Sequence, residues 1–254
     1  MSSHYFEFRN VYKSFDDNSV LRDVSFFSDR GQTAVIMGRS GVGKSVSLKL
    51  LLGFLRPDAG RIVVAGQDVT DWTEDEFAEM RRRVTMVFQS GALFDSLTVA
   101  ENVAFPFTRG GREGHEESER RVAELLDMLE VSQFADRLPA DLSTGTKRAV
   151  AIARALAEDP EAILYDEPTT MVDPLMAVHI SDLILKLKES FHKTSIVVTH
   201  DTHLAKKLAD RVIFLHEGSV AFFGDWREME ASNDPLIHNF LRQDELIPAL
   251  DAST

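Results

Sequence analysis

The feature that most constrains this chain is the segment Gly38-Arg39-Ser40-Gly41-Val42-Gly43-Lys44-Ser45, which directly follows the apolar stretch Thr33–Met37. The pattern is Gly, four residues and Gly-Lys-Ser between an expected strand and an expected helix, which is the context of a phosphate-binding loop. Its glycines let backbone N–H groups point at phosphate oxygens, and the following helix N-terminus adds positive field. We expect Lys44 to reach the β- and γ-phosphates and Ser45 to coordinate Mg²⁺. The pattern predicts nucleoside triphosphate binding; the alternative is a glycine-rich turn in an unrelated α/β protein.

Composition narrows the class of protein and its partners. A chain of 254 residues can bury a substantial core, and its longest apolar runs are strand-length and far short of a bilayer span. No basic and apolar leader is visible at the N-terminus. The absence of cysteine excludes disulfides and thiolate metal sites and is compatible with a reducing cytoplasm. The net charge of −13 argues against nucleic-acid binding and against direct binding to anionic lipid. Any membrane connection is therefore expected to run through a protein partner.

The order of apolar segments predicts strands and helices on both sides of a long helical stretch. Strands are expected at 4–11, 20–27, 33–37, 61–65, 84–88, 162–165 and 195–199, with a hairpin at 212–223. Helices are expected at 44–55, 74–83 and 176–190. Between about 90 and 157 there is no good strand candidate, and 115–129 forms an amphipathic helix. Such a helical insertion indicates a nucleotide-binding core that carries a small second lobe.

Two adjacent carboxylates, Asp166 and Glu167, follow the apolar stretch 162–165. At a strand end the chain can turn both side chains toward one site. We expect Asp166 to hold Mg²⁺ and Glu167 to polarise an attacking water near the γ-phosphate. The alternative is a solvated acidic turn.

Two further segments have ligand-binding character. His200 follows the apolar stretch 195–199, and in open parallel sheets ligands bind at the carboxyl ends of strands. The segment 141–149 reads as a capped helix start with Gly145 in its first turn, which would form a second anion site. The alternatives are a structural histidine and an ordinary helix cap.

In this order, the motifs resemble those of the ATP-binding-cassette (ABC) ATPases over almost the whole chain. Gly38–Ser45 resembles Walker A, and 162–167 resembles Walker B with its catalytic glutamate. The segment Leu142-Ser143-Thr144-Gly145-Thr146 stands where the family has its Leu-Ser-Gly-Gly-Gln signature. The resemblance also implies a Q-loop residue, a D-loop residue, a switch histidine and an adenine-stacking ring, at Gln89, Asp173, His200 and Phe15.

The resemblance implies that these motifs act on ATP and Mg²⁺. It assigns catalysis to Glu167, His200 and Gln89. ATP binding is assigned to Phe15, Gly38, Arg39, Ser40, Gly41, Val42, Gly43, Lys44, Ser45 and Gln89. The Mg²⁺ ligands would be Ser45, Gln89 and Asp166, while Ser143 and Gly145 would contact the γ-phosphate held by the opposite subunit.

The signature and the D-loop depart from the family pattern. Thr144 replaces the first signature glycine, and Thr146 replaces the glutamine. Met171 stands two residues before Asp173, where the family has a small residue. Because Ser143 and Gly145 are retained, we expect a working ATPase with an altered rate.

The resemblance also implies a fold. It is an α/β P-loop fold with a mostly parallel core sheet, an antiparallel β subdomain and an inserted helical subdomain. We expect residues 1–89 and 158–232 to form the nucleotide-binding core, 90–157 the helical subdomain, and 233–254 a C-terminal extension. Apolar residues in that extension would grip the opposite subunit or form a surface helix on their own domain.

A narrower resemblance follows the Q-loop. Residues 88–99 and 101–106 are similar to the lipid-handling Mla and Mce transport ATPases, as is the helix after the phosphate loop. In that family this region faces the coupling helix of a membrane subunit. Apolar Ala92, Leu93, Phe94 and Leu97 would suit such a partner, or would pack the helical lobe.

The resemblance implies a head-to-tail dimer of this chain on the cytoplasmic face of a membrane. Its partners would be integral membrane permease subunits and an Mce-type substrate-binding subunit, with a phospholipid or another hydrophobic substrate as cargo. Three alternatives stay open: another cargo (an amino acid, a metal or an organic solvent), a soluble cassette protein of DNA repair or translation, and a non-catalytic nucleotide sensor.

Overall fold

The computed structural model describes residues 4–110 and 115–242. The chain forms two compact units, one of residues 1–74 with 194–254 and the other of residues 75–193. The helical insertion predicted at 90–157 lies within the second unit, and its boundaries stay a prediction.

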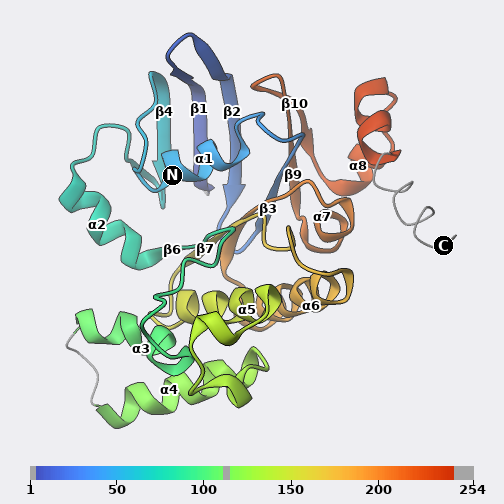
Figure 1. Cartoon of the computed structure of the whole chain (residues 1–254). Helices are drawn as coiled ribbons and strands as arrows, with labels where there is room; N and C mark the ends of the chain where they lie inside the picture. Colours follow the sequence, from blue (N-terminus) through green and yellow to red (C-terminus); the bar gives the residue numbers. More distant parts are fainter. Residues whose placement is uncertain (1–3, 111–114, 243–254) are drawn as a thin grey trace, which may run out of the picture. The chain divides into compact units, whose positions relative to one another are not determined.

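An antiparallel sheet forms one part of the first unit (Figure 1). Its strands are β1 (His4–Phe15), β2 (Asn18–Asp29), β4 (Ala59–Val64) and β5 (Gln67–Asp68), in the order β2-β1-β4-β5. The first two strands are longer than predicted, because the polar residues before the turn continue the ladder as far as the pair Phe15↔Asn18. The short strand β5 pairs with the end of β4, with Val63 opposite Asp68 and Val64 opposite Gln67.

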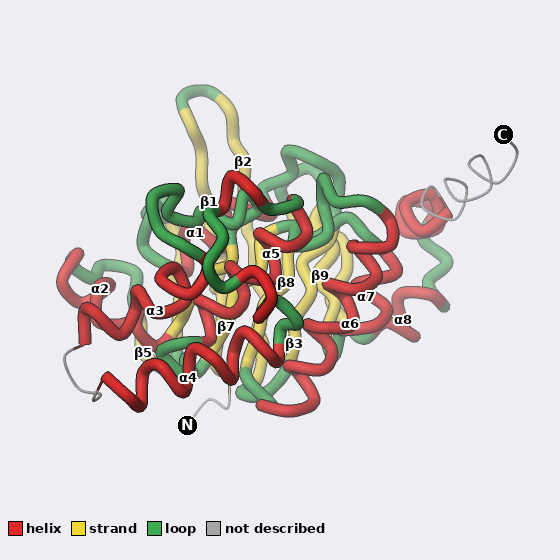
Figure 2. The backbone as a smooth tube through the Cα atoms, turned by 60° about the horizontal axis from the view of Figure 1, so that its bottom comes forward, coloured by secondary structure: helices red, strands yellow, loops and turns green. Residues whose placement is uncertain are grey.

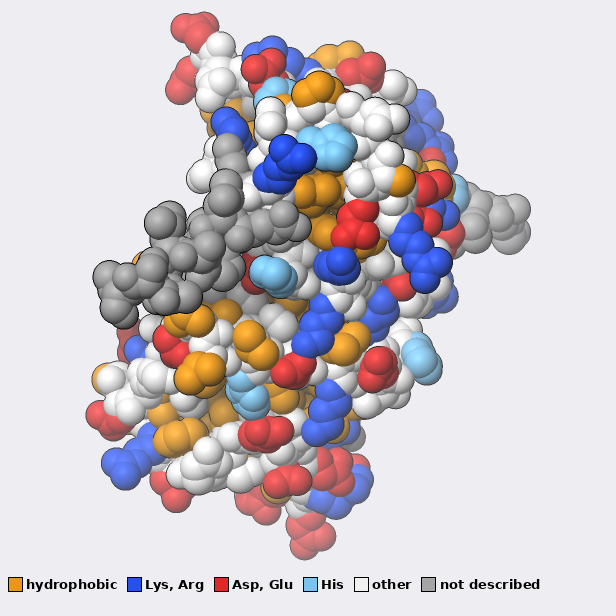
Figure 3. Space-filling model, turned by 90° about the vertical axis from the view of Figure 1, so that its right-hand side faces the viewer, with side chains coloured by type: hydrophobic (Ala, Val, Ile, Leu, Met, Phe, Trp, Pro, Cys, Tyr) orange, Lys and Arg blue, Asp and Glu red, His pale blue; other side chains and the backbone are white. Residues whose placement is uncertain are grey.

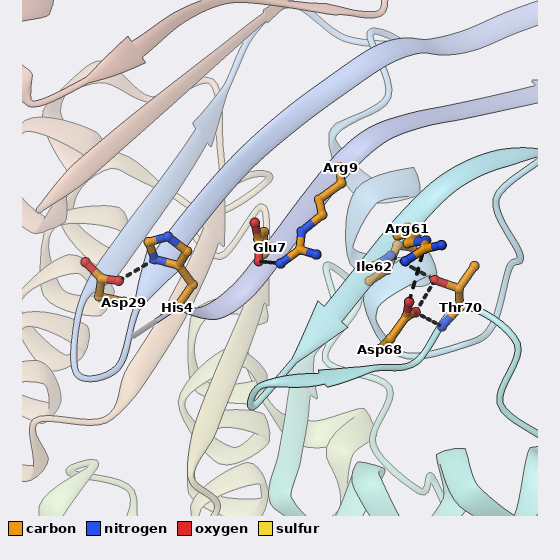
Figure 4. A network of polar contacts seen from close by, with 8 residues as sticks. All are labelled: His4, Glu7, Arg9, Asp29, Arg61, Ile62, Asp68 and Thr70. Carbon is orange, nitrogen blue, oxygen red and sulfur yellow. Dashed lines mark hydrogen bonds and ion pairs between the residues drawn. The ribbon is translucent and has the colours of Figure 1, made fainter. Parts of the chain in front are cut away.

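Polar contacts hold the ends of this sheet, as Figure 4 shows. The His4 ring and the Asp29 carboxylate link β1 to β2 at 2.6 Å. The Thr70 hydroxyl donates to Asp68 at 2.6 Å and accepts from the backbone N–H of Ile62 at 3.0 Å. Because these bonds satisfy groups at the sheet margin, they fix where β4 and β5 separate.

The remaining strands of the first unit carry the phosphate loop. They are β3 (Thr33–Met37), β8 (Thr194–Val198), β9 (Arg211–His216) and β10 (Ser219–Gly224), in the order β10-β9-β3-β8. β3 runs parallel to β8 and β9, and every residue of β3 and β8 is buried, as expected for strands covered on both faces. Figure 2 shows β3, β8 and β9 together among the yellow strands. The helices of this unit are α1 (Lys44–Leu51), α7 (Thr202–Leu208) and α8 (Trp226–Glu230).

The helix after the phosphate loop is shorter than predicted. It was expected to reach residue 55, but α1 ends at Leu51, with Leu52 as its C-cap. Gly53 follows with a φ of 72°, a left-handed conformation that glycine adopts without strain. The helix therefore stops at its first glycine.

The second unit is mainly helical and contains the parallel strands β6 (Val84–Val87) and β7 (Ala162–Asp166). α2 (Glu74–Arg83) has the predicted bounds and begins at the boundary between the units. The other helices are α3 (Val99–Gly110), α4 (His115–Met128), α5 (Thr144–Leu156) and α6 (Pro174–Phe191), with 3-10 turns at Ser132–Phe134 and Pro139–Asp141. The apolar side of the helix predicted at 115–129 is buried, at Val122, Leu125 and Leu126 in α4 and at Leu129 just after it.

Residues 235–242 form a further helix of the first unit. Ile237 is buried, and the Phe240 ring lies 4.8 Å from the Phe214 ring of β9. This part of the predicted extension thus packs on its own unit. The apolar residues Leu246 and Ile247 of the same prediction lie outside the described residues.

The surface carries charges of both signs. Figure 3 shows acidic and basic side chains interspersed with apolar ones on one face, so neither sign covers that face. Among residues 4–110 and 115–242, no helix is both long enough and apolar enough to span a bilayer.

Candidate functional site

The phosphate loop holds its own lysine. Lys44 is 6% exposed, and its ammonium group donates to the carbonyls of Gly38 at 2.8 Å and Arg39 at 3.1 Å. These acceptors are neutral, whereas a phosphate would offer charged oxygens, which bind an ammonium group more strongly. The lysine is therefore already placed inside the loop, with contacts that a nucleotide can replace.

Two glycines of this loop are required by close contacts. Gly38 has a φ of 144°, and a Cβ there would lie 2.4 Å from the carbonyl oxygen of Leu215. Gly43 has a φ of 104° as the N-cap of α1, and a Cβ there would lie 2.5 Å from Leu21. Any larger residue would have to displace the backbone of β9 or the side chain on β2. The shape of the loop therefore requires glycine at these two positions.

The first unit brings the phosphate loop and His200 to one sheet edge. β3 and β8 are parallel with Ile36 opposite Val198, and the N–H of Thr199 donates to the Ile36 carbonyl at 3.1 Å. The loop leaves one strand at that edge, and exposed His200 leaves the other. Parallel sheets bind ligands at this edge, so both predicted elements lie where a ligand would be expected.

Phe15 ends β1 with a ring that is 41% exposed. The Lys13 ammonium lies 5.4 Å from the ring centroid and 2.7 Å from the Asp58 carboxylate. Asp58 also accepts from the backbone N–H of Ser14, and its pKa is lowered, chiefly by the Lys13 hydrogen bond. An exposed ring held by its neighbours can stack on a base.

The second unit brings Gln89 to the same edge as the two carboxylates. β6 and β7 are parallel with Val87 opposite Tyr165, so exposed Gln89 lies at the strand ends that Asp166 and Glu167 occupy. Both carboxylates are 8% exposed, which does not fit a solvated acidic turn.

Glu167 has a strained backbone. Its φ is 47°, in the left-handed region that non-glycine residues rarely adopt. The Thr170 hydroxyl donates to Oε2 of Glu167 at 2.9 Å, and the Thr170 N–H donates to its carbonyl at 3.2 Å. The chain thus turns tightly after β7, and a side-chain bond within that turn holds the carboxylate.

The signature segment opens α5. Ser143 is the N-cap, and its hydroxyl oxygen accepts from the N–H of Thr146 at 3.1 Å. The two hydroxyl groups of Ser143 and Thr146 also lie 2.8 Å apart. Thr146, which departs from the family pattern, therefore contacts the serine that the family uses on the γ-phosphate. Thr144 is exposed at the helix start.

Gly145 and Asp173 tie the signature helix to α6. A Cβ on Gly145 would lie 2.5 Å from the Met176 side chain and 3.1 Å from its Cβ. Asp173 is the N-cap of α6, accepting from the Met176 N–H at 3.0 Å. The predicted D-loop aspartate thus caps the helix against which the signature glycine packs.

The segment after Gln89 is held by one buried amide. Asn102 is fully buried, and its nitrogen lies within 3.1 Å of the carbonyls of Phe94, Leu97 and Thr98. Its oxygen accepts from the N–H of Phe94 at 2.8 Å. Phe94 is 41% exposed and lies against Phe105, with ring centroids 4.3 Å apart. The loop therefore presents an apolar ring from a fixed backbone.

The donor set fits ATP with Mg²⁺. Ser45 and Asp166 offer oxygen ligands, which Mg²⁺ prefers, and Mg²⁺ bound with a nucleotide takes much of its shell from phosphate and water. Among the described residues there is no cluster of three or more His, Cys, Asp or Glu side chains able to hold a metal alone.

Sequence reasoning missed three residues of this region: Asn102, Arg148 and Thr170. Arg148 is 2% exposed at the start of the run Ala149–Ala153, all of which is buried. A charged residue beside an apolar helical run was the available signal, since a buried charge requires a partner. The other two gave no signal in the sequence, because their partners are mainly backbone atoms or a turn.

Comparisons with known proteins agree on one family. Residues 21–170 match the family model described as ABC transporter. Protein TRIGALACTOSYLDIACYLGLYCEROL 3, chloroplastic, of Arabidopsis thaliana is 35% identical over 254 residues, covering 92% of this chain and 72% of that protein. The probable ribonucleotide transport ATP-binding protein mkl of Mycobacterium leprae is 32% identical, covering 92% and 68%. The methionine import ATP-binding protein MetN of Brucella abortus is 36% identical, covering 97% and 66%.

Solved structures give the same result. A dimeric post-hydrolysis structure of the ATP-binding cassette MJ0796, bound to ADP and phosphate, matches with a TM-score of 0.80 and 35% identity, covering 87% of this chain and 98% of that chain. The cbiO1 structure from Clostridium perfringens, part of the complex cbiONQ, matches with a TM-score of 0.83 and 26% identity, covering 98% and 100%. The chain spans 66% to 72% of the length of the curated relatives named above.

The family match covers more than half of the chain, and the predicted P-loop fold is confirmed. The chain belongs to the ABC transporter family and is an ABC ATPase that binds ATP with Mg²⁺ and hydrolyses it.

Proposed function

We propose that this chain powers the movement of a phospholipid or another hydrophobic substrate through separate membrane subunits. One relative at 35% identity is named after a glycolipid. The segment after Gln89 resembles the lipid-handling members of the family. The cassette would lie on the cytoplasmic face of a membrane, attached through its partners.

In the proposed reaction, the motifs bind the nucleotide, hold Mg²⁺ and activate the attacking water. Phe15 stacks on adenine, the loop Gly38–Ser45 cradles the phosphates, and Ser45, Gln89 and Asp166 complete the Mg²⁺ shell. Glu167 polarises the attacking water, and His200 contacts the γ-phosphate. The buried, hydrogen-bonded carboxylate of Glu167 supports this assignment, because a general base must be held within reach of its water.

Two copies would form the working unit. Ser143 and Gly145 of one copy would contact the γ-phosphate bound by the other, so each site would need both chains. ATP would favour the closed dimer because it contacts both copies only in that state. The dimeric form of the MJ0796 cassette, at 35% identity, supports this arrangement.

The observation that carries the partner proposal is the loop held by Asn102. Four hydrogen bonds to backbone atoms fix this loop, and Phe94 stands on it half-exposed against Phe105. A fixed apolar surface loses little conformational entropy when a partner helix docks. This suits the coupling helix of a permease, with Ala92, Leu93 and Leu97 as its neighbours.

Amino-acid import is the second candidate for the cargo. The MetN relative, named for methionine import, is 36% identical over 97% of this chain. That identity is similar to that of the glycolipid-named relative, so overall identity does not separate the two cargoes. The cassette would use the same ATP chemistry in both cases.

The test is to purify the complex from membranes through a tag on this chain and to identify what is bound. We expect a polytopic membrane protein, an Mce-type subunit and a phospholipid, detected by mass spectrometry of the protein and solvent-extracted fractions. A Phe94→Asp variant should lose the membrane protein, whereas Phe54→Asp, at a 49% exposed ring elsewhere on the chain, should keep it. A complex that binds methionine and carries no lipid would overturn the lipid assignment.

A further inference from the structure

Arg148 is the largest side chain buried almost completely in the described residues, at 2% exposure. A guanidinium group loses much hydration on burial, so it persists only where hydrogen bonds and opposite charge compensate. It lies one turn into α5, two residues after the signature segment. Its partners therefore indicate what the burial achieves.

Those partners come from three motifs of the second unit. Nη1 of Arg148 donates to the carbonyl of Phe88 at 2.6 Å, one residue before Gln89. Nη2 donates to the carbonyl of Thr170 at 3.4 Å, in the turn after β7. Burial lowers the pKa of Arg148, and the Asp166 carboxylate opposes that shift, so the two charges stabilise each other.

Thr170 contacts both Arg148 and Glu167 and so links them. Its carbonyl accepts from Arg148, while its hydroxyl donates to Oε2 of Glu167 at 2.9 Å. Two residues of this turn have positive φ angles. Glu167 has a φ of 47°, and Met171, which follows Thr170, has a φ of 64°. Non-glycine residues keep such angles only where surrounding contacts impose them. The guanidinium group is one of the contacts that holds this turn.

We infer that Arg148 is a positioning residue for hydrolysis, which holds the Glu167 carboxylate through Thr170 and joins its turn to the signature helix and the end of β6. The inference rests on the proposed role of Glu167 as the base. The Thr170 hydroxyl fixes one carboxylate oxygen, and so fixes the plane in which the other oxygen can accept a proton. Arginine is suited to this because its planar group holds its N–H donors in a fixed fork and stays charged when buried.

The experiment measures ATP hydrolysis by the full chain in its native complex, together with ATP affinity and melting temperature. Arg148→Met should lower kcat about 10- to 100-fold, because small displacements of a catalytic group cost rates of this order. ATP affinity should change little. Thr170→Val, which removes only the hydroxyl at a half-buried site, should show a similar loss and covers the case in which Arg148→Met does not fold.

Arg83→Met is the matched control. Arg83 also lies in the second unit, and its Nε donates to Glu161 at 2.6 Å. This bond joins the starts of β6 and β7, at the other end of the strands from Gln89 and Glu167. The substitution removes a guanidinium group that contacts the starts of β6 and β7, whereas Glu167 follows the end of β7. It should leave kcat unchanged.

The Glu167→Gln background separates the inference from the function on which it rests. If Arg148 acts through the base, Arg148→Met should add little loss in that background. Normal kcat in Arg148→Met and Thr170→Val, with Glu167→Gln inactive, would overturn the inference and leave the proposed function intact. Equal losses in both backgrounds would also overturn it, as a general effect on folding. Normal hydrolysis by Glu167→Gln would instead overturn the role of the base.

Discussion

The phosphate loop and the turn that carries Glu167 both place a predicted site residue after a buried strand, but their backbones are held in different ways. In the loop, positive φ angles fall on glycines, at Gly38, Gly41 and Gly43. In the turn, they fall on Glu167 and Met171. Left-handed backbone costs a non-glycine residue about 1–2 kcal/mol, so contacts from outside the turn must offset that cost.

This difference shows what determines the backbone conformation in each segment. In the loop, the residue type determines the conformation, because glycine adopts positive φ angles without strain and Lys44 donates to carbonyls of its own loop. In the turn, hydrogen bonds from Thr170 and Arg148 hold a backbone conformation that non-glycine residues disfavour. The conformation of the loop therefore depends on its own residues, whereas the conformation of the turn also depends on Arg148, which is distant in sequence.

The largest effect is expected at the turn. Glu167→Gln should keep ATP binding and slow hydrolysis about 10²- to 10⁴-fold, a loss of about 3–5 kcal/mol of transition-state stabilisation. Single-turnover hydrolysis and nucleotide binding, measured on the same preparation, separate the two effects. Near-normal turnover would remove Glu167 from the role of base.

The next effect tests the loop. Lys44→Ala should weaken ATP binding about 10- to 100-fold, because a charged hydrogen bond contributes roughly 1.5–3 kcal/mol. Titration with a fluorescent ATP analogue measures this. Lys49→Ala is the control, since Lys49 lies exposed on the same helix. Equal affinity of the two variants would contradict the phosphate-loop assignment.

A pair of substitutions compares the two ways of holding a positive φ. Gly43→Ala should lower the free energy of unfolding by more than about 1 kcal/mol, because a Cβ meets Leu21 and the φ is 104°. Met171→Gly, at a φ of 64° and 81% exposure, should change stability by less than about 1 kcal/mol, because relieved strain offsets the added entropy of the unfolded chain. Urea unfolding of both variants gives the comparison. A larger loss in Met171→Gly would show that the side chain, not the backbone, matters at the turn.

The smallest effect is expected at Asp58, where an exposed ion pair holds the segment next to Phe15. Asp58→Asn should cost less than about 1 kcal/mol at pH 7, because exposed pairs are well screened. The pKa of Asp58 is lowered by Lys13 in the folded state, so its stabilisation is present above the unfolded pKa of about 4 and is lost as pH falls through the lowered value. The difference in urea midpoint between the wild type and Asp58→Asn should therefore shrink below about pH 4. A constant difference from pH 7 to pH 3 would contradict the ion-pair explanation.

Local signals predicted most of the fold. The strand Thr33–Met37 and the helix Glu74–Arg83 have the predicted bounds, because their apolar pattern and flanking residues are strong. The ends of β1 and β2 could not be predicted, since polar residues there are ordered by pairing across the hairpin.

The site divides in the same way. The phosphate loop and the carboxylates after β7 are visible as motifs, and their roles stay predictions that the variants above test. The contacts of Arg148 and Thr170 could not be read from sequence, because they join residues 60 and 22 positions away from the arginine. Only the folded chain brings those carbonyls together.

Asn102 has a consequence for how such a cassette can diversify. All the acceptors and the donor that its amide meets in the loop 94–98 belong to the main chain. The shape of this loop is thus independent of which side chains it displays. If a permease docks here as proposed, residues at 95–97 can change to suit a different membrane protein while the loop keeps its shape, and the nucleotide-binding motifs need not change with them.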